Sequence, residues 1–191
     1  MNNSFNIRPA TLADAEHIAL AVCMAVGYDS RHALYSVFLT LARMEHSQYS
    51  YLNTLVAEVD GAVVGALVGY DGARLKELRE PIFPLLRQHL GEVIDIEDET
   101  EAGEFYLDSL GVVPDYRGRG IGRALIEAMR DRAFAEGHTR VGLIVDIDNP
   151  SAERLYQSLG FRKVGDKRFL GHAMHHLQAI CCANLGWYGH R

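Results

Sequence analysis

The sequence predicts an α/β fold of the α+β type: a mixed, largely antiparallel central sheet of about seven strands, flanked by helices. Three observations support this prediction. Short apolar or β-branched segments are separated by segments whose apolar residues recur at helical spacing. Asp60-Gly61 stands between two of these strands and is a strong signal for an antiparallel hairpin. A glycine-rich turn, residues 118–122, joins an apolar strand to an amphipathic helix.

The N-terminal part begins with a short strand over residues 5–8, which Pro9 closes. Thr11 then stands as the N-cap of a helix whose apolar residues keep helical spacing as far as Gly27. The remaining elements expected in this part are a helix over 30–44 and strands over 55–58 and 62–68.

In the C-terminal part, strands and helices alternate. The apolar run 105–113 is expected to be a strand, and the helix behind the glycine-rich turn runs from Ile121 to Glu136, because Gly137 suits its C′ position. The other expected elements are a strand over 141–145, a helix that is capped by Asn149 or Ser151 and ends at Leu159, a strand that opens at Phe161, and a strand over 169–177.

Size and composition narrow the class of protein. A chain of 191 residues suits one domain. Its net charge of −6 disfavours nucleic acid as a main partner, and no apolar run approaches the ~20 residues that cross a bilayer. The N-terminus lacks the pattern of a signal peptide, and the odd number of cysteines (Cys23, Cys181 and Cys182) argues for a reducing compartment. We therefore expect a cytoplasmic protein without a membrane or nucleic-acid partner.

The glycine-rich turn is the clearest chemical signal. Three glycines alternate along residues 118–122, just where a strand ends and a helix begins. Free backbone N–H groups at such a helix start form a site for an anion, here a phosphate or pyrophosphate. Two familiar phosphate loops do not match: Gly122 is followed by Arg123 and Ala124 where a Walker loop needs Lys and Ser or Thr, and the spacing is not that of a dinucleotide fingerprint.

The pattern that remains, Arg117-x-x-Gly120-x-Gly122, resembles the pyrophosphate loop of the GCN5-related N-acetyltransferases (GNAT family), which hold acetyl-coenzyme A. Residues 149–152, followed by Tyr156 and then by 160–161, are similar to the family's second conserved segment. The close resemblance covers roughly residues 104–178.

The resemblance implies the domain organisation. A single N-acetyltransferase domain would span 1–178, with an insertion over 72–103 between the third and fourth strands and a C-terminal tail over 179–191. The insertion is expected to be helical over 72–90, broken at Pro81 and Pro84, and the charges of its remainder are all acidic. Three roles stay open for it: a solvated surface excursion, a lid or wall over the acceptor pocket that favours a cationic amine, and a contact between subunits.

The resemblance also implies how acetyl-coenzyme A is held. In the family, backbone N–H groups of the loop bind the pyrophosphate, and a bulge splays the fourth strand from the fifth so that the pantetheine arm enters the gap. Mid-strand Gly111 fits such a bulge or a close backbone approach. Arginines of the loop can add charge or be solvated, and Asn149 either binds the cofactor arm or only caps a helix. The implied cofactor-binding residues are Leu110, Gly111, Val112, Arg117, Gly118, Arg119, Gly120, Ile121, Gly122, Arg123, Asn149 and Ser151.

Two residues are expected to carry the proton transfers. Tyr156 lies two helical turns after Asn149 and is the expected acid for the leaving thiolate, with a packing aromatic as the alternative. Asp108 is the expected base and would act through a water; Glu104, a water chain, or a merely structural role for Asp108 are the alternatives. Strand alternation puts Tyr106, Asp108 and Leu110 on one face.

No metal is expected. In a strand, His172 and His176 share a face while His175 points away, so the three imidazoles do not converge. Cys181 and Cys182 have no expected catalytic role, because the thioester is attacked directly in this family.

The sequence thus predicts an N-acetyltransferase that moves an acetyl group from acetyl-coenzyme A to a primary amine by direct attack in a ternary complex. A small amine or polyamine is the first expectation for the acceptor, and a protein N-terminus or lysine is the second. Three alternatives stay open: a non-catalytic acyl-coenzyme A binder, a different acyl donor such as succinyl-coenzyme A, and an interaction protein that uses the insertion. A homodimer is also open, because family members often pair.

Overall fold

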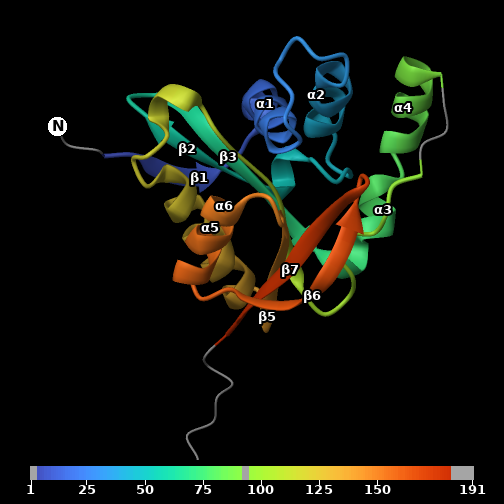
Figure 1. The fold of residues 1–191 in the computed structure, drawn as a ribbon. Coiled ribbons are helices and arrows are strands. Elements are labelled where there is room, and N and C mark those ends of the chain that lie inside the picture. The colour runs from blue at the N-terminus through green and yellow to red at the C-terminus, as the bar shows by residue number, and fades with distance from the viewer. Residues whose placement is uncertain (1–3, 92–94, 182–191) are drawn as a thin grey trace, which may run out of the picture.

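One seven-stranded sheet organises the chain (Figure 1). The computed structural model describes residues 4–91 and 95–181. The strand order is β1-β2-β3-β4-β5-β7-β6, and the neighbours are antiparallel except for the parallel pair β4–β5. This is the predicted mixed, largely antiparallel sheet. The strands are β1 (Asn6–Pro9), β2 (Thr54–Val59), β3 (Ala62–Asp71), β4 (Phe105–Val112), β5 (Arg140–Asp146), β6 (Arg162–Phe169) and β7 (His172–Ile180).

Helices cover both faces of the sheet, and each face has its own hydrophobic core. In Figure 1, α1 and α2 lie on one side of the sheet and α5 and α6 on the other. Buried residues of α1, α2 and the insertion helices form the first core, and those of α5, β5 and β7 form the second. The helices are α1 (Ala15–Ala25), α2 (Tyr35–Arg43), α3 (Leu75–Arg79), α4 (Ile82–Leu90), α5 (Ile121–Ala135) and α6 (Pro150–Ser158). In the two described ranges, no helix has the length and apolar character needed to cross a membrane.

Several expected boundaries are wrong; for example, β3 ends at Asp71 and not at residue 68. The helix predicted from Ser30 begins only at Tyr35, because the preceding loop is held in turns, with the Arg31 amide donating to Asp29 at 2.8 Å. The seventh strand was expected from Phe169, but that residue ends β6 and pairs with His172 across a tight turn. Leu170 adopts the left-handed conformation there (φ 48°), which a leucine rarely takes and which its sequence does not signal.

The bulge that the resemblance implied lies at Asp108. Val68 pairs with Ser109 and Gly69 pairs with Leu107, so Asp108 is the extra residue on β4. A one-residue insertion reverses the alternation of side chains beyond it. Leu110 therefore packs with the second core and does not share the face of Tyr106, which belongs to the first; the expectation for Leu110 was wrong.

Beyond the bulge, β4 separates from β5. The two strands pair only at Phe105 with Val141 and at Tyr106 with Gly142. Gly111 lies in the separated stretch, and its role is close approach: an added Cβ would be 2.5 Å from the Cα of Ala21 in α1. The sheet thus has the predicted splay, and a helix is packed tightly behind one of its edges.

The insertion buries one face of its helices and part of its acidic stretch, while most of its described residues are exposed. Leu75, Leu78, Ile82 and Leu86 of α3 and α4 join the first core. Glu99, Thr100 and Glu104 of the acidic stretch are also buried. The expectation of a solvated excursion is wrong for these residues: every third or fourth position of α3 and α4 packs into the first core, and the buried polar side chains have hydrogen-bond or ion-pair partners. Residues 92–94, with their predicted acidic side chain Glu92, lie outside the described part.

At the C-terminus, β7 continues to Ile180, so the first two residues of the expected tail, Ala179 and Ile180, are strand. Cys23 and Cys181 are free thiols. Cys182 and the rest of the predicted tail lie outside the described residues.

Candidate active site

The glycine-rich turn builds an anion site at the start of α5. Gly118 and Gly120 have positive φ values of 73° and 82°, a conformation that favours glycine. Gly120 is the N-cap, and the first intrahelical bond runs from the Ala124 amide to its carbonyl at 3.0 Å. The amides of the three residues before Ala124 therefore precede the helix ladder and can donate to an anion. A Cβ on Gly118 or Gly120 would meet no atom within 4 Å, so a ligand can reach this backbone.

A groove with a volume of about 430 Å³ runs from this turn along β4. Nine of the implied cofactor-binding residues line it: Leu110, Gly111, Val112, Arg117, Gly118, Gly120, Ile121, Gly122 and Arg123. Arg119 does not line it; its guanidinium donates to the carbonyl of Asp115 at 3.0 Å and lies over the ring of Tyr116. The structure thus brings most of the implied residues together and leaves Arg119 bound to the turn itself.

The floor of the groove is an unpaired strand edge. The Val113 amide donates to the Val64 carbonyl at 2.9 Å, and in an antiparallel ladder such bonded pairs alternate with unbonded ones. Leu110 and Val112 are in unbonded pairs with β3, so their backbone groups point to the gap that β5 leaves open. The side chain of Arg117 donates to one of them, the Val112 carbonyl, at 2.9 Å. The N–H groups of Leu110 and Val112 face the groove.

Tyr156 lies beside this edge on α6. Its ring meets Phe161 edge to face at 6.1 Å, and it lines a small cavity of about 30 Å³ together with Asp108 and Leu110. Burial raises the pKa of the phenol above its ordinary value. The side chain is therefore protonated at neutral pH and can donate.

Asn149 and Ser151 sit at the other end of α6. The Asn149 side chain accepts bonds from the Ala152 amide at 3.1 Å and the Ser151 hydroxyl at 3.0 Å. This is an N-cap, the alternative role considered for Asn149. Neither residue lines the groove described above.

Asp108 is held from three sides on its bulge. Its Oδ2 accepts from the Tyr70 hydroxyl at 2.6 Å and the Gln48 amide at 2.7 Å, and its Oδ1 accepts from the Ser109 hydroxyl at 2.6 Å. It lines the same small cavity as Tyr156. That volume suits one or two water molecules, which is consistent with a base acting through water.

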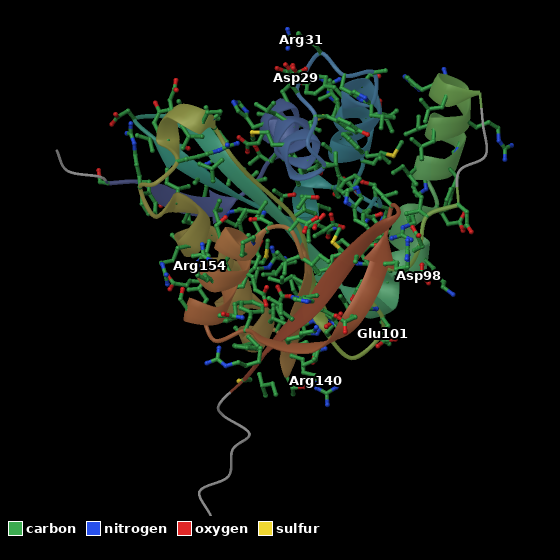
Figure 2. The ribbon with its side chains drawn as sticks, viewed as in Figure 1. Asp29, Arg31, Asp98, Glu101, Arg140 and Arg154 are labelled. Carbon is green, nitrogen blue, oxygen red and sulfur yellow. The ribbon has the colours of Figure 1, made fainter. Side chains whose placement is uncertain are left out.

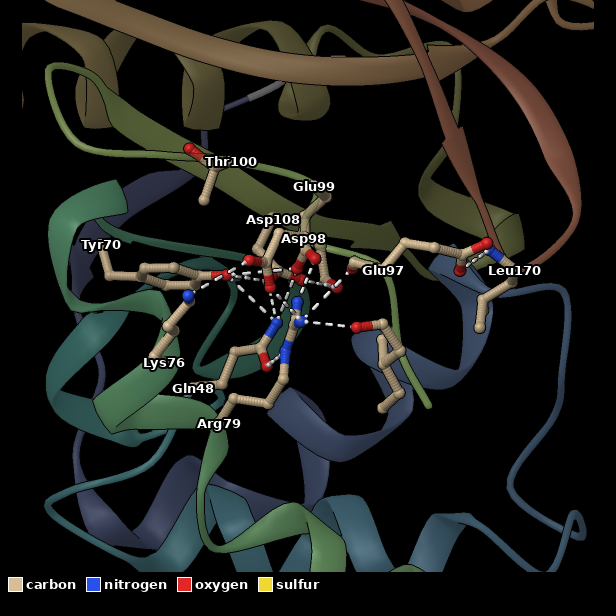
Figure 3. A network of polar contacts seen from close by, with 12 residues as sticks. Gln48, Tyr70, Lys76, Arg79, Glu97, Asp98, Glu99, Thr100, Asp108 and Leu170 are labelled. Carbon is tan, nitrogen blue, oxygen red and sulfur yellow. Dashed lines mark hydrogen bonds and ion pairs between the residues drawn. The ribbon is translucent and has the colours of Figure 1, made fainter. Parts of the chain in front are cut away.

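Glu99 is a neighbour of this site that the sequence did not predict. Its Oε1 accepts from the Gln48 amide at 2.9 Å, and its Oε2 pairs with the guanidinium of Arg79 (Figure 3). Burial, and then the charge of Asp108, raise the pKa of Glu99 to about 7. One signal was available: Arg79 follows Leu75 by four residues, which puts a cation on the buried face of a helix and calls for a buried anion.

Glu104, the alternative base, is bound elsewhere. Its carboxylate accepts from Thr100 at 2.7 Å, His176 at 2.9 Å and Gln178 at 2.7 Å. Burial raises its pKa, but these hydrogen bonds outweigh burial and lower the pKa overall. Glu104 does not line the cavity of Tyr156 and Asp108, so its place is that of a satisfied structural carboxylate.

The three histidines of β7 each have a carboxylate partner of their own. His172 contacts Asp146, His175 contacts Glu153, and His176 contacts Glu104. Among the residues of known placement, no three histidine, cysteine or acidic side chains gather in a way that could hold a metal ion.

Comparisons with known proteins identify the class that this fold and site define. The family model described as the acetyltransferase (GNAT) family matches residues 26–161. An acetyltransferase of Sodalis glossinidius is 33% identical over 118 residues, which are 61% of this chain and 62% of the relative. The N-alpha-acetyltransferase RimI of Mycobacterium tuberculosis is 46% identical over 69 residues, which are 36% of this chain and 42% of the relative.

A crystal structure of an acetyltransferase has a TM-score of 0.76 at 32% identity, and the match covers 92% of this chain and 98% of that chain. The chain belongs to the acetyltransferase (GNAT) family. The matched segments span less than two thirds of the two curated relatives. The family uses acetyl-coenzyme A.

Proposed function

We propose that this protein transfers an acetyl group from acetyl-coenzyme A to a primary amine by direct attack in a ternary complex. One observation carries the proposal: Leu110 lines both the long groove that starts at the anion site and the small cavity that holds Tyr156 and Asp108. The anchor for a phosphate-bearing ligand and the two proton-transfer groups therefore meet at one point of β4.

The residues present fit acetyl-coenzyme A. The loop offers free amides and no side chain at Gly118 and Gly120, which suits a pyrophosphate. The open edge of β4 offers backbone N–H and C=O groups, which suit an extended amide-bearing arm in the way an added strand would be held. When bound, acetyl-coenzyme A would supply the thioester whose acetyl group is transferred.

The protein's own residues would then perform four tasks. Amides of residues 118–123 hold the pyrophosphate, and the N–H of Leu110 or Val112 polarises the thioester carbonyl. Asp108 accepts, through a water, the proton that the acceptor's ammonium group must lose, because a free alkyl amine has a pKa near 10.4. Tyr156 gives its proton to the sulfur as the carbon–sulfur bond breaks.

For the acceptor we propose a small amine or polyamine first. The half-buried carboxylate of Asp108 and the buried carboxylate of Glu99 beside the site favour a cationic group over a neutral one. A protein N-terminus is the second candidate, and the name of the Mycobacterium tuberculosis relative, an N-alpha-acetyltransferase, supports it.

Calorimetric titration with acetyl-coenzyme A tests the proposal. Gly120→Asp places a carboxylate at the anion site in a conformation that Asp tolerates, and Gly120→Asn is its uncharged match. Binding should be saturable at one site in the unaltered protein and weakened at least ten-fold more by the Asp variant than by the Asn variant. Gly137→Asp, at the far end of α5 with the same kind of positive φ, should bind normally.

Turnover is then measured with a panel of primary amines. Binding without turnover of any amine would favour the alternative of a non-catalytic acyl-coenzyme A binder. No binding at millimolar acetyl-coenzyme A would show that the groove is not an acetyl-coenzyme A site, and the proposed reaction would then be wrong.

A further inference from the structure

The insertion brings a second carboxylate next to Asp108. The side-chain amide of Gln48 bridges the two: its nitrogen is 2.7 Å from Oδ2 of Asp108 and 2.9 Å from Oε1 of Glu99. The oxygen of the same amide accepts from Nε of Arg79 at 3.4 Å, which fixes the orientation of the amide. Figure 3 shows these side chains converging from different elements of the fold.

This cluster carries more negative than positive charge. Buried Arg79 faces Glu99, and it also contacts Asp98 at 3.1 Å, but the Asp98 side chain is 51% exposed and so is screened by water. Inside, one cation faces the two carboxylates of Glu99 and Asp108. The other titratable groups around them are the phenols Tyr49, Tyr70 and Tyr106, and burial raises the pKa of each well above its ordinary value, so they stay neutral.

A buried negative charge without a partner is costly, and a proton is the simplest way to remove it. Gln48 and Tyr70 contact both carboxylates, so a proton on Glu99 changes the charge around Asp108. Burial and the charge of Asp108 raise the pKa of Glu99 to about 7, so Glu99 takes up and releases a proton near neutral pH. Such a pair is able to take up a proton from a group that lies against Asp108.

Building on the function proposed above, we propose that Glu99 is a positioning residue that, through its shared contacts with Asp108, makes the pair the acceptor of the proton that the substrate ammonium group loses. The nitrogen–hydrogen bond of the ammonium breaks, a water passes the proton on, and an oxygen–hydrogen bond forms on Asp108. The freed lone pair on nitrogen is then available to attack the thioester.

Tyr70 lets the pair adjust to this proton. Its hydroxyl donates to Oδ2 of Asp108 at 2.6 Å and lies 3.4 Å from Oε1 of Glu99. When Asp108 is protonated, the phenol hydrogen can turn toward Glu99, which is then the remaining carboxylate. The geometry thus keeps one donor for whichever carboxylate carries the charge.

The test compares Glu99→Gln with Asp98→Asn. Both variants remove a carboxylate that contacts Arg79, but Asp98 lies at the surface beside α3 (Figure 2) and does not contact Gln48 or Asp108. The pH dependence of kcat/KM for a primary amine is measured for all three proteins. We expect an acid limb near pH 7 in the unaltered protein and in Asp98→Asn.

In Glu99→Gln, the limb should move at least one unit lower, and kcat/KM at pH 8 should fall at least ten-fold, because a lone carboxylate holds a proton less tightly than a repelling pair. An unmoved limb in Glu99→Gln would overturn the proposal, even if the rate fell, because a structural role lowers activity without changing the titration.

A carbon-13 NMR titration of the Glu99 carboxyl in the unaltered protein needs neither turnover nor a folded variant. A midpoint near 7 is expected, and an ordinary midpoint near 4.5 would overturn the inference. If no primary amine is acetylated but the Glu99 carboxyl titrates with a midpoint near 7, the proposed function is wrong. The inference that Glu99 holds a proton near neutral pH is then still supported.

Discussion

Single residues of the site show how the protein sets the protonation of its groups through local contacts. Tyr156 is half-buried against the second core, where its ring contacts Phe161, and its raised pKa keeps the proton on the phenol until a stronger base forms next to it. Asp108 has three hydrogen-bond donors and a cavity on its remaining side. These surroundings are consistent with the roles proposed above, Tyr156 as the proton donor and Asp108 as a base that acts through a water.

Tyr156→Phe should lower kcat by about 100-fold, because positioned general acids contribute on the order of 10²–10⁴-fold. The ring and its contact with Phe161 are kept, so the Kd for acetyl-coenzyme A should not change. Steady-state kinetics and calorimetry measure the two quantities. Tyr51→Phe, which loses a hydroxyl near Glu45 away from the site, is the control. An unchanged kcat would show that Tyr156 is a packing aromatic.

Asp14 shows the same local control in a structural ion pair. Arg8 donates two hydrogen bonds to its carboxylate, at 2.8 and 3.0 Å, and lowers the pKa of Asp14 to about 2. Because the folded-state pKa lies below the ordinary value of 3.8, this stabilisation is complete above pH 4 and is lost as the pH falls through 2. Asp14→Asn should lower the free energy of unfolding at pH 7 by about 2 kcal/mol.

Urea unfolding at pH 7 and at pH 2.5 checks this prediction. The difference between the two proteins should shrink at the lower pH. Asp29→Asn removes an exposed ion pair with Arg31, at the tip of the loop between α1 and α2 (Figure 2), and should change stability little at either pH. A difference for Asp14→Asn that is independent of pH would contradict the role of its charge.

At the scale of elements, the sequence located strands and helices well but could not predict the bulge. Apolar periodicity and the Asp60-Gly61 signal gave β2, β3 and their turn, since these depend on neighbouring residues only. The bulge at Asp108 depends on how β4 pairs with β3, about 40 residues earlier in the chain. The pattern of apolar and polar residues in β4 itself does not indicate where the extra residue lies. Leu110 was therefore assigned to the wrong face.

In the candidate site, too, features set by consecutive residues were predictable, and features set by distant contacts were not. The glycine-rich turn was predictable because the conformation and the free amides belong to consecutive residues, Gly118 to Arg123. Glu99 was not predictable, because its partners Gln48 and Arg79 come from other elements and its surroundings in the sequence resemble a solvated acidic run. Contacts that depend on the packing of the insertion are beyond what a local pattern contains.

The packing of α1 against β4 gives a prediction at this scale. An alanine at position 111 would place its Cβ 2.5 Å from the Cα of Ala21 and 2.8 Å from the Cε of Met24. Backbone has to move, so Gly111→Ala should cost about 1–3 kcal/mol of stability and widen the groove edge. Gly165→Ala, where a Cβ meets nothing within 4 Å, is the control. Equal unfolding midpoints in urea for the two variants would contradict the close approach.

At the scale of the whole molecule, the insertion joins regions that are far apart in the sequence. Its helices complete the first core, His89 contacts Ser36 of α2 at 3.0 Å, and Glu97 accepts a bond from the Leu170 amide at the turn between β6 and β7 at 3.0 Å. Its Glu99 contacts Gln48 and Tyr70, which also contact Asp108. The segment therefore contributes to folding and to the proposed chemistry at once, and its deletion would remove both.

This double role predicts how the stability of the whole domain depends on pH. The pKa of Glu99, about 7, lies above the ordinary value of 4.5, so the folded state binds this proton more tightly than the unfolded state. The corresponding stabilisation is complete below pH 4.5 and is lost as the pH rises through 7. Glu99→Gln has no such proton to lose, so its stability should fall less steeply between pH 5 and 8.

The free energy of unfolding, measured in urea at pH 5, 6, 7 and 8, tests this expectation. Over this range, the difference between Glu99→Gln and the unaltered protein should change by on the order of 1–3 kcal/mol in favour of the variant. A constant offset from the lost contact with Arg79 does not affect the comparison, because only the slopes are compared. Asp98→Asn should follow the unaltered protein, since its carboxylate is half exposed. Parallel curves for all three proteins would mean that Glu99 is ionised throughout this range and that the buried pair holds no proton.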